Sequence, residues 1–317
     1  MIRIRMERPF SITHLTSSKK MKKKLAYTFG VLLLVMIGYN IYKTIIHRIE
    51  EKKHRAWVET LTPTASENVH ILTDTITIDY LNKKRTLALY LPENYATDTV
   101  DYPVIYFMDG ESLFDQKIQE GTEWQVDEVL DSIRQLGQAS AIVVGIYSSE
   151  NRLREYKPFP STRWYSHKRV SGDKHANWIV NSVKPWIDAR YRTKKEAQST
   201  IIGGASLGGL MSYYMLMEYP DVFGGAIVFS PSFWVSEVVY QLHEKNKRLA
   251  QQKIYFDAGR LETPTVNSIE RMREVLLASG MPAEDIKLDI EEGEGHWHMT
   301  WRKGFPKAYP WIIEAKE

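Results

Sequence analysis

The chain has 317 residues, of which 43% are hydrophobic and 26% charged, which argues against a collagen, a wholly disordered chain or a polytopic membrane protein. It contains no cysteine, which excludes disulfides, thiolate metal sites and a cysteine nucleophile. Residues 1–65 carry thirteen basic and four acidic side chains, whereas the rest of the chain is mildly acidic. Because that larger part shows no basic stripe, we expect no nucleic-acid partner.

The N-terminal arm has the charge pattern of a membrane-directed segment. Residues 1–24 form a basic N-terminus, and the uncharged run 25–42 is about 27 Å long as a helix, against a hydrocarbon core of about 30 Å. The pattern predicts a transmembrane signal anchor with a cytoplasmic N-terminus and a periplasmic or extracellular catalytic part. No small-x-small cleavage site follows, so retention is preferred to the alternative, a cleaved signal that leaves a secreted protein.

Residues 43–67 are predicted to be a stalk and linker. Isoleucines alternate with charged residues after Thr44, which fits a continued helix, and the segment 61–66 contains Pro63 and breaks it. We expect one folded domain over residues 68–317.

Strand-like and helix-like runs alternate through this domain. Two alternating runs, Val69–Asp79 and Arg85–Leu91, predict an antiparallel hairpin. Solidly apolar runs predict strands covered on both faces: Val104–Met108, Ala141–Ile146, Thr200–Ile202, Ala226–Phe229 and Ile254–Phe256. The last strand is expected over Ile286–Ile290. Apolar residues at helical spacing predict helices over Glu123–Leu136, His175–Ile187, Leu207–Met217 and Ile269–Leu277. The order predicts an α/β fold with a mainly parallel sheet and helices on both faces.

A Gly-x-Ser-x-Gly motif identifies the candidate nucleophile. Gly204, Ser206 and Gly208 stand between an apolar strand and a helical run, which is the context of a nucleophile elbow. Glycines are needed there because a side chain would collide with the neighbouring strand and helix.

Ser206 requires a general base, which in this arrangement follows it in the sequence. His296 follows the last predicted strand in a glycine-rich loop and is the preferred base; His298 is the alternative, and His243 lies in a polar stretch. The pair of histidines lacks a third ligand at recognisable spacing, so no metal is expected.

The acid that orients the histidine has two candidates around the strand 253–257. Asp257 ends the strand, whereas Glu262 follows in a glycine turn beyond the carboxyl edge, where α/β sites are built. The longer glutamate side chain favours Glu262, and Asp257 stays the alternative acid.

The sequence resembles an esterase family of the α/β hydrolases, which includes esterase D-like, enterochelin, feruloyl and acetylxylan esterases and the mycolyltransferases. The resemblance spans nearly all of residues 68–317. Its segments are Tyr102–Gly110, Val143–Arg152, Pro185–Thr193, Phe229–Trp234, and His296 with Trp301. It implies an α/β-hydrolase fold, and its glycine turn supports Glu262 as the acid.

The resemblance also implies the chemistry. A serine esterase would form an acyl-enzyme on Ser206, with the backbone N–H groups of Leu207 and Glu111 as the oxyanion hole. No metal or organic cofactor is implied. The substrate would be a small-molecule or carbohydrate ester, either of an enterochelin-like siderophore or of feruloyl or acetyl groups.

Substrate-binding candidates lie in the loop after residue 147, which is rich in arginine and aromatic side chains. They are Arg152, Arg154, Tyr156 and Trp164, whose chemistry suits planar phenolic or sugar groups. Two other functions stay open: an acyltransferase of the same fold, and a membrane-tethered binding module without catalysis. The oligomeric state is not predicted.

Overall fold

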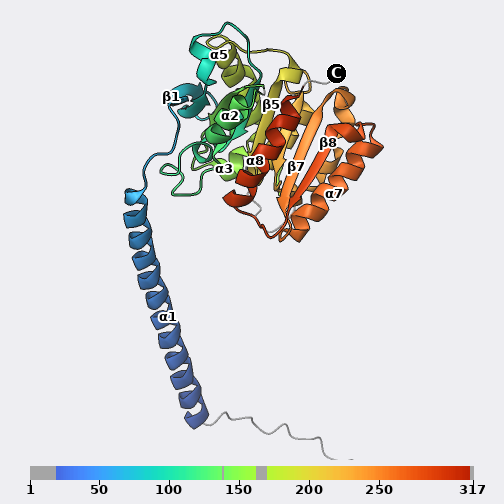
Figure 1. Ribbon diagram of the computed structural model, residues 1–317. Helices are drawn as coiled ribbons and strands as arrows, with labels where there is room; N and C mark the ends of the chain where they lie inside the picture. Colours follow the sequence, from blue (N-terminus) through green and yellow to red (C-terminus); the bar gives the residue numbers. More distant parts are fainter. Residues whose placement is uncertain (1–18, 138, 162–169, 315–317) are drawn as a thin grey trace, which may run out of the picture. The chain divides into compact units, whose positions relative to one another are not determined.

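The computed structural model describes residues 19–137, 139–161 and 170–314, and the chain divides into two compact units, Met1–Thr60 and Leu61–Glu317. In the first unit the described residues form one continuous helix, α1 (Lys19–Thr60; Figure 1). Apolar side chains along it are exposed. Among the described residues this is the one helix long and apolar enough to cross a membrane. The division into basic terminus, anchor and stalk remains a prediction.

The second unit is built on an eight-stranded sheet in the order β1-β2-β4-β3-β5-β6-β7-β8. The strands are β1 (Val69–Ile78), β2 (Lys83–Tyr90), β3 (Val104–Met108), β4 (Ile142–Ile146), β5 (Thr200–Ala205), β6 (Gly225–Phe229), β7 (Lys253–Gly259) and β8 (Ile286–Glu291). β1 and β2 form an antiparallel hairpin, β2 also pairs antiparallel with β4, and all other pairs are parallel. The predicted mainly parallel sheet with an N-terminal hairpin is confirmed.

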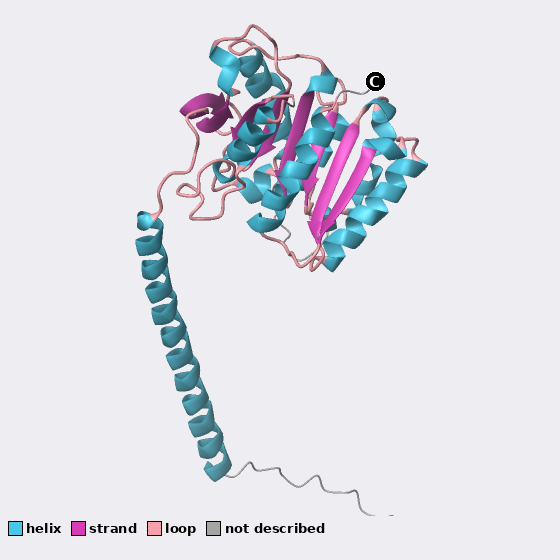
Figure 2. Ribbon diagram, viewed as in Figure 1, coloured by secondary structure: helices cyan, strands magenta, loops and turns pink. Residues whose placement is uncertain are grey.

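Helices cover both faces of the sheet (Figure 2). One face packs against α2 (Val126–Gln135) and α8 (His298–Ile313). The other packs against α4 (Gly172–Trp178), α5 (Lys184–Asp188), α6 (Leu207–Glu218) and α7 (Thr263–Ala278). Along β3, Ile105 and Phe107 enter the first layer while Tyr106 and Met108 enter the second, so this strand is buried on both faces, as its apolar run predicts.

Two helical segments depart from the periodicity of the sequence. A π-helical segment, Ile179–Val183, separates α4 from α5 within the helix expected over 175–187. The sequence also gave no clear signal for α8, because Pro306 and Pro310 lie inside it. The helix forms because an apolar stripe that includes Trp301 and Phe305 packs onto the sheet, and tertiary packing outweighs the loss of two N–H donors.

The second unit begins at Leu61, ahead of the Asn68 start that the sequence pattern suggests. The Thr64 hydroxyl donates to the Glu123 carboxylate at 2.9 Å, and the Ser66 N–H donates to Asp127 at 2.7 Å. These bonds hold the end of the predicted linker against the segment that leads into α2.

Candidate active site

The predicted catalytic side chains meet at one edge of the sheet. Ser206 follows β5, Glu262 follows β7 and His296 follows β8, and these three strands run parallel. Because the carboxyl ends of parallel strands lie at the same edge, residues far apart in the sequence are brought into contact.

Ser206 occupies a strained turn between β5 and α6. Its φ and ψ angles are 60° and −119°, a conformation that costs a non-glycine residue on the order of 1–3 kcal/mol. The turn is tight because Gly204 and Gly208 are in backbone contact: a Cβ at Gly204 would lie 2.7 Å from the Gly208 carbonyl carbon. The glycines of the motif therefore have the steric role that the sequence suggests.

A hydrogen-bonded series connects the three side chains. His296 Nε2 lies 2.9 Å from Ser206 Oγ, and His296 Nδ1 lies 2.5 Å from Glu262 Oε2. Burial tends to raise the pKa of Glu262, but hydrogen bonds from His296 and Ser230 outweigh it, so its pKa lies below the ordinary value. An ionised carboxylate only accepts, so Nδ1 carries the proton and Nε2 accepts the hydroxyl proton of Ser206.

Ser230 and Trp301 hold Glu262 in place. The Trp301 indole N–H donates to Ser230 Oγ at 3.0 Å, and the Ser230 hydroxyl donates to Glu262 Oε1 at 2.7 Å. The Gly259 N–H donates to the same carboxylate oxygen at 3.1 Å. The sequence analysis did not single out Ser230; its position directly after a buried parallel strand was the available signal.

Asp257, the alternative acid, lies elsewhere. Its carboxyl group is completely buried beside Gly304 of α8, and within the described part of the chain neither oxygen has a hydrogen-bond partner. Burial, reinforced by the Glu291 carboxylate, raises the pKa of Asp257 to about 9. The structure thus brings Glu262, and not Asp257, to His296.

The protonated state of Asp257 predicts a pH-dependent stability. Its folded pKa lies above the unfolded value of about 3.9, so between about pH 4 and pH 9 the folded state holds the extra proton and this contribution falls as pH rises. We expect Asp257→Asn to remove that slope. Thermal unfolding followed by circular dichroism should show a smaller decrease in Tm from pH 5 to pH 8 for the variant than for wild type; equal decreases would contradict the prediction.

The expected oxyanion donors lie on two turns at the same edge. Leu207 is the first residue of α6, so its N–H has no intrahelical acceptor. Glu111 follows Asp109, which has a left-handed φ of 58°, and Gly110. A Cβ at Gly110 would lie 2.3 Å from the Gly145 carbonyl carbon, so only glycine permits this approach to β4.

Side chains fix the turn that carries Glu111. The Asp109 N–H donates to the Tyr156 hydroxyl at 3.1 Å, and Arg152 donates to both Asp109 carboxylate oxygens at 2.5 and 2.7 Å. The Glu111 carboxylate accepts the Ser148 N–H at 2.9 Å and also its hydroxyl. The turn is therefore anchored to the segment that follows β4.

The substrate-binding candidates separate in the structure. Arg152 lines the cavity beside Ser206, and Arg154 is exposed on α3 (Arg152–Glu155). Tyr156 is completely buried, so its assignment as a substrate-facing residue is wrong: its ring packs in the core and its hydroxyl supports Asp109. Trp164 lies outside the described residues.

The cavity beside Ser206 has a volume of about 340 Å³. It is lined by Asp109, Glu111, Ser112, Gln119, Trp124, Ser148, Arg152, Ala205, Ser206, His296, His298 and Trp301. The alternative base, His298, does not pair with the serine; its Nδ1 accepts the Trp124 indole N–H at 3.0 Å. His243, which the sequence places in a polar stretch, lies in the 3₁₀ segment Glu237–Lys245.

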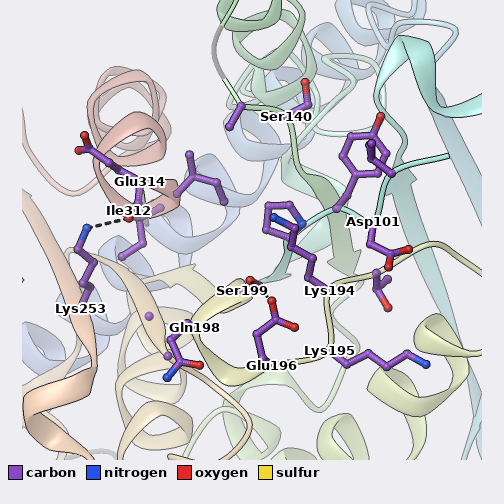
Figure 3. A pocket seen from close by; sticks show the side chains of 18 of the residues that line it. Asp101, Ser140, Lys194, Lys195, Glu196, Gln198, Ser199, Lys253, Ile312 and Glu314 are labelled. Atoms are coloured by element: carbon purple, nitrogen blue, oxygen red, sulfur yellow. Dashed lines mark hydrogen bonds between the residues drawn. The ribbon is translucent and has the colours of Figure 1, made fainter. Parts of the chain in front are cut away.

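A larger cavity of about 1240 Å³ opens at the opposite edge of the sheet (Figure 3). Its lining includes Lys194, Lys195 and Glu196 ahead of β5, and Lys253 at the start of β7. Lys253 donates to the Glu314 carbonyl at 3.0 Å. Of the sequence-predicted site residues that the structure describes, none lines it. Size alone therefore does not locate the chemistry, and we place the candidate active site at the smaller cavity.

Among the residues that the structure describes, no group of three or more His, Asp or Glu side chains could hold a metal ion. The expectation of chemistry without a cofactor stays a prediction.

The sheet order, the strand–turn–helix at Ser206 and the helical layers are those of an α/β hydrolase. The family model described as "Esterase: Putative esterase" matches residues 78–312, and the chain belongs to this family. It is a carboxylic ester hydrolase.

Individual relatives match most of the second unit. YbbA of Bacillus subtilis (strain 168) is 29% identical over 72% of this chain and 92% of its own length. The ferri-bacillibactin esterase BesA of the same organism is 25% identical over 68% of this chain and 81% of its own. A solved ferulic acid esterase superimposes with a TM-score of 0.62 at 18% identity, covering 78% of this chain and 98% of that one, which shows the shared fold.

Proposed function

We propose that this esterase acts through Ser206 as nucleophile, His296 as general base and acid, and Glu262 as the orienting acid. The observation that carries the proposal is the pair of hydrogen bonds, 2.9 Å from Ser206 to His296 and 2.5 Å from His296 to Glu262. The described residues thus supply a nucleophile, a base of the correct tautomer and an ionised orienting group in one series.

In the first half of the reaction, Ser206 Oγ attacks the ester carbonyl carbon while His296 Nε2 takes the hydroxyl proton. The carbonyl oxygen becomes an oxyanion, which the N–H groups of Leu207 and Glu111 stabilise; one such donor is typically worth about 3 kcal/mol. The tetrahedral intermediate then expels the alcohol, which takes the proton from His296.

In the second half, water attacks the acyl-enzyme and His296 takes its proton. The tetrahedral intermediate then expels Ser206 Oγ, which takes the proton back from His296, and the carboxylic acid is released and the starting state restored. Glu262 stabilises the positively charged imidazole in both halves without accepting its proton, which agrees with the lowered pKa of this carboxyl group.

The proposed substrates are esters of phenolic or catecholic acids, or of acetylated or feruloylated carbohydrate. Indole rings of Trp124 and Trp301 and the guanidinium of Arg152 line the cavity, and such groups suit planar oxygenated rings. Among the similar proteins, one is named a ferri-bacillibactin esterase and one a ferulic acid esterase.

A substrate panel tests the proposal. It comprises p-nitrophenyl esters, acetylated and feruloylated xylan, and a catecholate siderophore, each assayed with wild type and with Ser206→Ala. Hydrolysis of at least one class by wild type alone is expected. Equal hydrolysis by both proteins would overturn the mechanism.

We further propose that α1 anchors the enzyme in a membrane, with the catalytic unit on the non-cytoplasmic side. The support is the exposed apolar surface of the helix and the lysines in its first turns, ahead of the apolar run. The expected result is recovery in the membrane fraction, with resistance to high salt and release by detergent, because the attachment is apolar. When the wall and outer layers are removed and the cell membrane is left intact, protease added outside should degrade the catalytic unit. Recovery in the cytosol would contradict the topology.

A further inference from the structure

We propose that His298 is a specificity-determining residue, whose Nε2–H donates a hydrogen bond to a neutral oxygen of the substrate. That oxygen would belong to a hydroxyl, phenol or ether group next to the ester being cleaved. The inference rests on the proposed function of Ser206 and extends it, because it names the chemical feature of the substrate that the cavity selects.

The tautomer of His298 follows from its neighbour. Trp124 is buried, and its indole N–H can only donate, at 3.0 Å to His298 Nδ1. Nδ1 must therefore present a lone pair, and the proton of the neutral ring must lie on Nε2. The cavity wall thus contains a donor whose direction is fixed by a second buried side chain.

The ring also stays neutral at ordinary pH. Burial lowers the pKa of His298, and the positive charges of Arg152 and Arg302 act in the same direction, against the opposing effect of Asp109. Protonation would moreover place an N–H on Nδ1, directly opposite the indole N–H of Trp124. His298 is consequently unsuited to the role of base and suited to that of donor.

The Nε2–H group has no acceptor on the protein within the described part of the chain. His298 lines the cavity beside Ser206, and its Nδ1 edge is covered by Trp124, so the Nε2 edge is the polar edge available to a ligand. The Trp301 ring packs against both histidines. Its ring centroid lies 5.0 Å from that of His298 and 5.5 Å from that of His296. The donor therefore has a fixed place relative to the reacting serine.

The charge of the cavity favours a neutral acceptor. The Arg152 guanidinium is neutralised by its two hydrogen bonds to Asp109, and Glu111 adds a carboxylate that is satisfied by Ser148. With His298 uncharged, a substrate carboxylate would meet no uncompensated positive charge. A volume of about 340 Å³ with two indole walls has room for one ring-bearing group.

Matched esters test the inference on the detergent-solubilised full chain. The acyl arm compares methyl cinnamate with its 3-hydroxy and 4-hydroxy derivatives, and the alcohol arm compares phenyl acetate with the hydroxyphenyl acetates. We expect wild type to prefer a hydroxylated ester in one arm by about tenfold in kcat/KM, the size expected of one hydrogen bond. The arm that shows the preference identifies the side of the ester that His298 contacts.

The variants separate the donor from the ring. His298→Phe should bring the preference ratio close to one, chiefly through KM, whereas His298→Gln, which keeps an N–H donor, should retain part of it. Trp124→Phe keeps His298 but removes the group that fixes its tautomer, and should lower the ratio as well. The matched control is His70→Gln, an exposed histidine on β1, which should keep the wild-type ratio.

Two failures are distinguishable. Suppose that Ser206→Ala is inactive. If His298→Phe and Trp124→Phe then fold and keep the wild-type preference ratio, or if wild type shows no preference in either arm, the inference is overturned and the proposed function stands. If Ser206→Ala turns over the esters as fast as wild type, the proposed function fails and the inference fails with it.

Discussion

Ser206→Ala should lower kcat for activated esters roughly a thousandfold or more, because the nucleophile and the groups that activate it act as a unit. The substitution removes the one atom that lies 2.9 Å from His296 Nε2 and leaves the glycine contacts of the turn in place. Stopped-time assays with p-nitrophenyl acetate measure the loss, and circular dichroism should show an unchanged fold.

The control for that variant is Ser132→Ala, which removes an exposed hydroxyl on α2 that donates only to a backbone carbonyl. It should retain wild-type turnover. Near-wild-type activity in Ser206→Ala would mean that ester cleavage takes place at another centre.

The second large effect is expected at Glu262. Glu262→Gln replaces an acceptor-only carboxylate by an amide that can present N–H to Nδ1, which favours the wrong tautomer of His296. We expect kcat to fall by roughly a thousandfold or more, with a smaller change in KM. Steady-state kinetics on the same ester measure both parameters.

Asp257→Asn is the matched comparison, because it also converts a buried carboxyl group into its amide. Its carboxyl group lies against α8 and does not contact His296, so turnover should stay within about threefold of wild type. Loss of activity in Asp257→Asn alone, with both variants folded, would transfer the role of orienting acid from Glu262 to Asp257.

Local sequence signals were sufficient for the sheet and for the tight turn that carries Ser206, the proposed nucleophile. Uninterrupted apolar runs indicate strands buried on both faces, and glycines around Ser206 indicate a tight strand-to-helix turn; both are properties of a few neighbouring residues. The loop after the last strand likewise indicated His296, because α/β folds place such loops at the functional edge.

The remaining features depend on contacts between distant segments. Ser230 reaches Glu262 only once β6 and β7 pair, and the tautomer of His298 depends on Trp124, far away in the sequence. Tyr156 looked like a substrate-facing aromatic residue because composition does not distinguish a buried ring from an exposed one. Helix α8 was obscured by its prolines, whose cost is offset by packing on the sheet.

The contact between Gly110 and Gly145 suggests how such an enzyme can change its substrate without losing its chemistry. The two glycines meet backbone to backbone, so a larger residue at either position cannot be accommodated by a rotamer change and would displace the turn that carries Glu111. The side chain of His298, by contrast, lines the cavity without holding that turn, so its replacement alters shape and polarity but not the course of the main chain. Evolutionary divergence is therefore expected to be tolerated at His298 and almost forbidden at the glycine pair, and directed evolution for a new ester should randomise the former and leave the latter untouched.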